Sequence, residues 1–167
     1  MEEKLENVKL PANHVDLKMD ENEINRKLNN ISGYIGTYAI NELINLSIRI
    51  FPAYMVVNLD KRQHGGTHWI GIAIYLNDIY VCDSLGTIFP DNHLPFEIIT
   101  FLHRISFKKH LHITKQLQCK TSNTCGKYAT YFVHTFSLLH NYNRFLENFC
   151  KDCTMNDVII DILYNTI

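Results

Sequence analysis

Residues 65–86 read GGTHWIGIAIYLNDIYVCDSLG, and this stretch decides the fold. Two runs rich in Ile, Tyr and Val, residues 68–76 and 79–83, flank the dipeptide Asn77-Asp78, whose composition is typical of a tight turn. The pattern predicts a β-hairpin with His68 at the start of its first strand and Asp83 at the end of its second. Because pairing brings the open ends of a hairpin together, we expect these two side chains to lie within reach of each other.

The segments around the hairpin predict an α+β domain with a central mixed sheet and flanking helices. Asp20 and Glu23 form a capping-box-like helix start, and the helix ends near Gly33. The hydrophobic spacing further predicts helices at 39–51, 94–105 and 125–140, a buried strand at 54–59, an edge strand at 111–118 and one or two short helices within 145–167. We expect a polar N-terminal extension, residues 1–19, and a single domain, residues 20–167.

Composition excludes some classes of function. A net charge of −1 and a pI near 6.7 give no strong basic footprint for nucleic acid. The local cluster of Lys108, Lys109, His110 and His112 is either a solvated face or a weak nucleic-acid patch. The N-terminus lacks the apolar core of a secretion signal, and no stretch is long and apolar enough for a membrane span. An odd count of 5 cysteines therefore predicts free thiols in a reducing compartment.

Cys125 is the candidate nucleophile. It follows KTSNT, residues 120–124, which is rich in N-cap residue types, and it opens the predicted helix 125–140. The free N–H groups and the positive end of the helix dipole favour a thiolate at this position. Gly126 would let another chain approach without a Cβ in the way. The alternative is a buried structural cysteine, which is among the most buried residue types.

The remaining candidates complete the machinery for acyl transfer. His68 is suited to act as a neutral base for the thiol and later as an acid for the leaving amine, with Asp83 fixing its orientation. Trp69 would shield the His–Asp hydrogen bond and form a wall of the cleft, or simply pack in the core. An oxyanion needs hydrogen-bond donors, and the Cys125 amide and the side chain of Gln118 are candidates, with Gln116 as a rival.

The order His68, Asp83, Gln118, Cys125 resembles that of the adenovirus-type maturation proteases, or adenains, which share a clan with the SUMO-specific proteases. The similar stretches are GYIGTY (33–38), VVNLDKRQHGGTHW (56–69), YVCDSLG (80–86) and LQCKTSNTCGKYATYFVHTF (117–136). The seven-residue step from Gln118 to Cys125 favours the adenain branch. The acid differs, because the adenoviral enzymes tend to have Glu where this chain has Asp83. The short, Asn-, Ile- and Lys-rich chain suggests a virophage, a Polinton-like element or a related virus as its source.

The resemblance implies a papain-like cysteine protease fold and an endopeptidase that cuts viral capsid or core precursors at Gly-Gly or Gly-X sites, with an aliphatic residue a few positions upstream. The groove would be lined by Trp69 and by glycines, among them Gly33, Gly36, Gly65, Gly66 and Gly126. The sequence itself calls for no cofactor. The family also implies activation by DNA or by a disulfide-linked peptide, which the charge and the lack of cysteine in 105–115 do not favour. We expect a monomer that acts in the virion and at the host-cell site of assembly.

Three alternatives remain open at this point. The first is a protease that removes ubiquitin-like modifiers, which would need a broad surface for a folded partner. The second is an idle protease fold that serves as a scaffold or a capsid-binding module. The third is a zinc or redox site built on Cys150 and Cys153, with His134 and His140 as further ligands, although one CxxC pair is a weak signal.

Overall fold

The computed structural model describes residues 18–64, 66–87, 95–105 and 110–167. The first 17 residues of the predicted extension, Gly65, and Lys108 and Lys109 of the basic cluster lie outside the described residues. Five strands form one mixed sheet in the order β1-β2-β3-β4-β5, with parallel pairs at both edges and antiparallel pairs in the centre. The strands are β1 (Tyr34–Ala39), β2 (Ala53–Asn58), β3 (Trp69–Ile74), β4 (Asp78–Cys82) and β5 (His110–Ile113).

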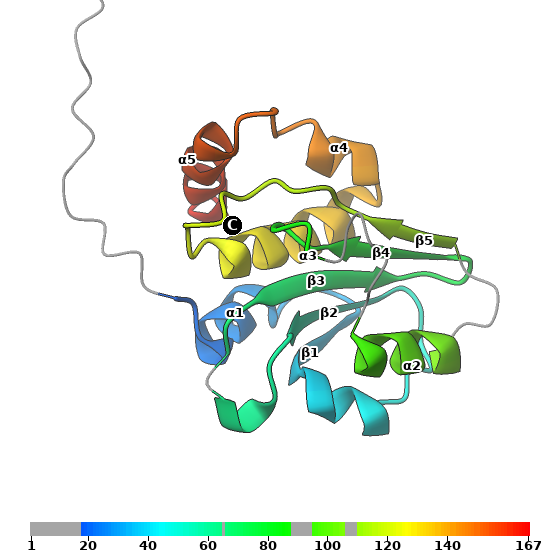
Figure 1. Ribbon diagram of the computed structural model, residues 1–167. Coiled ribbons are helices and arrows are strands. Elements are labelled where there is room, and N and C mark those ends of the chain that lie inside the picture. Colours follow the sequence, from blue (N-terminus) through cyan, green and yellow to red (C-terminus); the bar gives the residue numbers. More distant parts are fainter. Residues whose placement is uncertain (1–17, 65, 88–94, 106–109) are drawn as a thin grey trace, which may run out of the picture.

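Helices cover both faces of this sheet (Figure 1). One face packs against α1 (Glu21–Leu28), α3 (Cys125–Leu139), α4 (Tyr142–Leu146) and α5 (Cys153–Tyr164). The other packs against the short 3₁₀ helix η1 (Ile40–Asn45) and α2 (Phe96–Ile105). A second 3₁₀ turn, η2 (Arg62–His64), follows β2. Every residue of β2 is buried, because successive side chains enter the two cores alternately. The predicted α+β class is confirmed.

Helix α3 lies close against the middle of the sheet because β3 has a glycine beneath it. A Cβ placed on Gly71 would lie 2.8 Å from a ring carbon of Phe132 and 2.9 Å from the backbone oxygen of Ala129. Only glycine allows the helix to approach this closely. Cys125 is the first residue of α3, and His68 immediately precedes β3. The close contact between α3 and β3 brings these two ends together.

The predicted hairpin is confirmed as β3 and β4, but residues 75–77 connect the strands and Asp78 already belongs to β4, so the turn is not at Asn77-Asp78. The helices predicted from Asp20 to near Gly33, at 94–105 and at 125–140 are confirmed as α1, α2 and α3. The α-helix predicted at 39–51 is wrong, because only the short 3₁₀ helix η1 forms there. The strand β1 that precedes it, residues 34–39, was not predicted. Residues 34–39 pair in parallel with the fully buried β2, so sheet pairing decides the conformation of this segment. The η1 helix stops early, where Arg104 donates hydrogen bonds to the carbonyls of Leu43 and Leu46.

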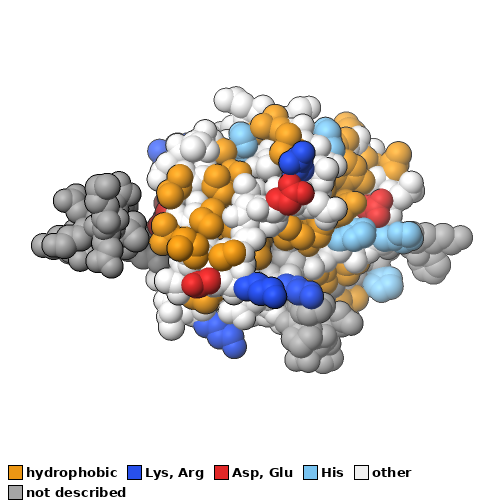
Figure 2. Space-filling view, turned by 90° about the horizontal axis from the view of Figure 1, so that it is seen from above, with side chains coloured by type: hydrophobic (Ala, Val, Ile, Leu, Met, Phe, Trp, Pro, Cys, Tyr) orange, Lys and Arg blue, Asp and Glu red, His pale blue; other side chains and the backbone are white. Residues whose placement is uncertain are grey.

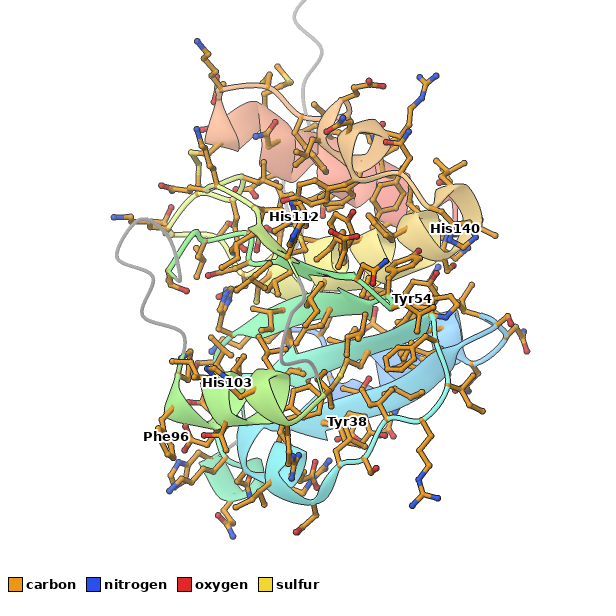
Figure 3. All side chains as sticks on the ribbon, turned by 90° about the vertical axis from the view of Figure 1, so that its right-hand side faces the viewer. Tyr38, Tyr54, Phe96, His103, His112 and His140 are labelled. Carbon is orange, nitrogen blue, oxygen red and sulfur yellow. A yellow bond between two sulfur atoms is a disulfide. The ribbon has the colours of Figure 1, made fainter. Side chains whose placement is uncertain are left out.

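Strand β5 is shorter than predicted, because the chain leaves the sheet after Ile113. The amides of Leu117 and Gln118 then donate to the backbone oxygen of Ser84 rather than to a strand partner. The edge position itself is confirmed. His112 from the predicted basic cluster stacks on the Tyr80 ring and lies 3.1 Å from the Asp78 carboxylate (Figure 3).

The prediction of five free thiols is wrong for two of them. Cys119 and Cys153 form a disulfide that ties the loop after β5 to the first residue of α5. Helix α5 packs against α3, buries Asn156, Ile160 and Tyr164, and exposes Met155, Val158 and Ile162. Hydrophobic side chains are spread over the face of the molecule seen in Figure 2. The three cysteines that remain free are Cys82, Cys125 and Cys150.

The disulfide also removes the zinc and redox alternatives that combine Cys150 with Cys153. Cys153 is bonded to Cys119 instead, and His140 lies beside Tyr54 and Tyr75, within 3.2 Å and 2.8 Å of their hydroxyls (Figure 3). Across the described ranges, no group of three or more His, Cys, Asp or Glu side chains is arranged to hold a metal ion. No helix in this part of the chain is long and apolar enough to cross a membrane.

Loss of the disulfide is expected to lower the free energy of unfolding by about 3–4 kcal/mol, because the bond spans 34 residues and restricts the unfolded chain. The measurement is thermal unfolding of the wild type with and without dithiothreitol, beside a variant in which Cys119 and Cys153 are both alanine. Cys150→Ala is the control and should respond to the reductant as the wild type does. Equal unfolding temperatures in both conditions would contradict the pairing.

Candidate active site

His68 and Asp83 meet at the open end of the β3–β4 hairpin. Nε2 of His68 lies 2.6 Å from Oδ1 of Asp83. The Asp83 residue is fully buried, and the His68 side chain is 9% exposed. The sequence prediction that the turn brings these two side chains together is confirmed.

Asp83 is held on several sides. Its Oδ1 also accepts from the amide of Leu85 at 3.2 Å, and its Oδ2 accepts from the hydroxyl of Thr87 at 2.7 Å. Its backbone N–H donates to the hydroxyl of Thr114, which in turn donates to the Asp83 carbonyl, each at 2.9 Å. A carboxylate anchored in this way has little freedom to rotate, so the imidazole bonded to it has a fixed orientation.

The environment of His68 favours its charged form. Burial, the largest influence, lowers the pKa of His68, but hydrogen bonding to Asp83 and Cys125 and the charges of these two residues raise it to about 9. Nε2 is occupied by Asp83, so Nδ1 is the ring nitrogen left for the thiol. Nδ1 is buried and has no partner at full hydrogen-bond geometry among the described residues. The contact with Cys125 is therefore a loose one, as is common at catalytic sites before substrate tightens them.

Cys125 is the first residue of α3 and is 7% exposed. The N-cap residue, Thr124, makes no capping hydrogen bond with its side chain, and its hydroxyl donates to Asp157 of α5 instead. Cys125 therefore lies at the N-terminal end of α3, as the sequence predicted, where backbone amides have no partner within the helix. The thiol lines a narrow hollow of about 30 Å³ together with Gly66, Trp69, Gln118 and Ser122.

Of the two glutamines, only Gln118 is among the lining residues of that hollow. It is 1% exposed, and its Nε2 donates to the backbone oxygen of Ser122 at 2.8 Å. Gln116 is exposed, and its side chain donates to the Gln118 carbonyl. The structure therefore brings Gln118, and not Gln116, next to Cys125.

The predicted groove residues divide into two groups. Trp69 and Gly66 line both the hollow at Cys125 and a larger neighbouring one of about 270 Å³. Gly36 lies within β1 against the Tyr38 ring and is not among the lining residues of either hollow. Gly33 likewise contacts Pro52 and Tyr54 in the sheet.

Met19 occupies the space beside Gly126, and the sequence did not predict this contact. A Cβ on Gly126 would lie 2.8 Å from the Cβ of Met19, so the approaching chain is the protein's own N-terminal segment. The indole N–H of Trp69 donates to the Met19 carbonyl at 3.1 Å. Met19 thus fixes the Trp69 ring at the edge of the cleft. A single methionine before a helix carries no sequence signal for this role.

The model of the adenovirus endoprotease family matches residues 44–159, a range that holds His68, Asp83, Gln118 and Cys125. The chain belongs to the adenovirus endoprotease family. The resemblance drawn from the sequence motifs is confirmed. None of the curated proteins compared with the chain matches it significantly.

Two solved structures show that this family member shares its fold with distant proteins. The ASFV pS273R protease is 13% identical with a TM-score of 0.55, over 84% of this chain and 63% of that one. The central domain of the uncharacterized Lpg1148 protein from Legionella pneumophila is 11% identical with a TM-score of 0.53, over 89% of this chain and 95% of that one. This chain thus spans less than two thirds of the ASFV protease, and at these identities the likeness concerns the fold alone.

Proposed function

We propose that the protein is a cysteine endopeptidase in which Cys125 attacks the scissile carbonyl. The observation that carries the proposal is the buried imidazole of His68, which is bonded to Asp83 through one nitrogen and is left with the other for the thiol. Family membership adds support, because the matched region contains all four candidate residues. Asp83 is the orienting acid, and Gln118 and the Cys125 amide are the oxyanion donors.

The raised pKa of His68 changes the expected first step. With a pKa of about 9, the imidazole holds its second proton at neutral pH. We therefore propose that the reactive form is a Cys125 thiolate beside a His68 imidazolium, rather than a thiol beside a neutral base. The sulfur bonds to the carbonyl carbon, and the C–N bond then breaks as the His68 proton passes to the leaving amine, which leaves a thioester on Cys125. The neutral imidazole next takes a proton from water, which attacks the thioester, and the C–S bond breaks to release the acid product and restore the thiolate.

The shape of the cleft supports a substrate with small residues at the scissile bond. About 30 Å³ of space beside Cys125 leaves little room for side chains, which fits Gly-Gly or Gly-X sites. The larger hollow that Trp69 also lines offers room for a further part of the substrate, and the aliphatic preference upstream is proposed from the family alone. We propose capsid or core precursor proteins as the substrates, on the strength of the family. Action in the virion or at the site of virus assembly is part of the same proposal.

Cleavage of a short-peptide library tests this function, with folded ubiquitin-like fusion proteins assayed alongside and Cys125→Ala as the blank. We expect the wild type to cut short peptides after glycine with an aliphatic residue upstream. Release of folded modifiers without cleavage of short peptides would instead favour a deconjugating protease. No cleavage of either class would favour an idle scaffold.

The pH dependence of kcat/KM is expected to report the His68 pKa. Activity should fall as the pH rises through about 9, because the imidazolium that protonates the leaving amine is lost there. Asp83→Asn removes the charge that raises this pKa, while burial continues to lower it, so the alkaline limb should move to lower pH. Some activity should remain, because the Cys–His pair itself is intact.

The measurement is a pH profile of both proteins with one fluorogenic peptide, and intact folding is checked by thermal unfolding. An alkaline limb at the same pH in both would mean that Asp83 does not tune His68. An unaffected rate in Asp83→Asn would mean that another residue orients the ring.

A further inference from the structure

Ser84, the residue after Asp83, contacts the candidate oxyanion donor Gln118. The hydroxyl of Ser84 donates to Oε1 of Gln118 at 2.7 Å, and the two residues are 0% and 1% exposed. The Ser84 carbonyl also accepts from the amides of Leu117 and Gln118, at 2.8 and 2.9 Å. One turn after β4 therefore holds both the backbone and the side chain of the glutamine.

These contacts fix which way the Gln118 amide faces. An amide side chain has one accepting oxygen and two N–H donors. The oxygen receives the Ser84 hydroxyl, and one N–H goes to the carbonyl of Ser122. These two bonds leave the second N–H available, and Gln118 is one of the residues that line the hollow at Cys125. A reversed amide would bring its oxygen against the Ser122 carbonyl, two acceptors facing each other.

We infer that Ser84 is a positioning residue that holds the Gln118 amide with one N–H directed at the developing oxyanion. The inference rests on the proposed role of Gln118 in the cysteine endopeptidase. Two adjacent residues then orient two different groups of the site. Asp83 orients the acid–base residue His68, and Ser84 orients the oxyanion donor Gln118. Ser84 itself does not touch the substrate.

Ser84→Ala tests the inference through steady-state kinetics with a fluorogenic peptide that carries Gly-Gly before the scissile bond and leucine further upstream. Loss of the hydroxyl leaves the buried Oε1 without a donor and frees the amide to rotate. We expect kcat to fall about tenfold while KM stays unchanged, because the lost interaction forms only in the transition state. Ser84→Thr keeps the hydroxyl and should recover most of the rate.

A double-mutant cycle separates positioning from a general packing defect. In a Gln118→Ala background there is no amide to orient, so adding Ser84→Ala should cause no further loss of kcat. Ser137→Ala, which removes a hydroxyl that donates to the His134 carbonyl on α3, is the matched control and should leave kcat unchanged. Active-site titration corrects every rate for the folded fraction, and Ser84→Cys replaces Ser84→Ala if the alanine variant does not fold.

Three results would overturn the inference. Equal losses from Ser84→Ala in the wild-type and Gln118→Ala backgrounds would mean that Ser84 acts independently of Gln118. Full activity in Ser84→Ala would mean that the hydroxyl is dispensable. Full activity in Gln118→Ala would show that Gln118 is not an oxyanion donor, and the Ser84 inference would fail with it. The protease assignment is tested separately, by peptide cleavage in the wild type and its loss in Cys125→Ala.

Discussion

Replacing Cys125 with alanine is expected to abolish peptide cleavage, with a loss of kcat of at least about 10⁴-fold. The Cys125 thiolate forms the bond to the carbonyl carbon, and alanine has no nucleophilic atom that could replace the sulfur. The fold should survive, because alanine is smaller than cysteine and is favourable in a helix. The measurement is the turnover of the fluorogenic peptide by purified variant and wild type, each checked by thermal unfolding.

The other free cysteines provide matched controls for this result. Cys150 is exposed and lies outside the cleft, so Cys150→Ala should retain full activity. Cys82 is buried, and burial raises the pKa of its thiol well above the ordinary value, so it should react poorly with alkylating agents. Residual cleavage by Cys125→Ala in the absence of contaminating proteases would contradict the mechanism.

Gln118→Ala is expected to lower kcat by about 10²–10³-fold with little change in KM. The amide N–H stabilises the charge that develops on the carbonyl oxygen, and this charge is absent from the bound ground state. The variant also leaves the Ser84 hydroxyl without its acceptor, so a modest loss of stability should accompany the kinetic effect. Steady-state kinetics and thermal unfolding measure the two effects separately.

Gln116→Ala is the natural control, because the sequence alone left both glutamines open as donors. Gln116 is exposed, does not line the hollow at Cys125, and donates to the Gln118 backbone oxygen, so its removal should change kcat by less than about threefold. A larger loss in Gln116→Ala than in Gln118→Ala would reverse the assignment of the oxyanion donor.

The sequence predicted the parts of the site that depend on local pattern. Two apolar runs separated by a polar Asn77 predict the hairpin, and strand pairing brings His68 to Asp83 even though the turn lies at residues 75–77. A run of N-cap residue types before an apolar stripe likewise marks the start of α3 at Cys125. Both signals lie within a single element or turn, where backbone geometry relates sequence spacing to spatial proximity.

The features that were missed depend on contacts between distant segments. Strand β1 forms because β2 offers it a partner, and the preference of its own residues did not reveal this. Cys119 and Cys153 are 34 residues apart in the sequence and are neighbours only in the folded chain. Met19 reaches Gly126 and Trp69 across the site, and Ser84 reaches Gln118 from another strand end. Spacing in the sequence carries no record of such contacts.

Covalent trapping of the nucleophile tests the central claim most directly. The full-length protein would be treated with a peptide vinyl ester that ends in Gly-Gly, and the intact mass and the modified residue would be determined by mass spectrometry. We predict one adduct per chain on Cys125, strongly slowed in His68→Ala and absent in Cys125→Ala. Cleavage of peptide substrates by a protein whose Cys125 stays unmodified, or an adduct on Cys82 or Cys150 instead, would contradict the account.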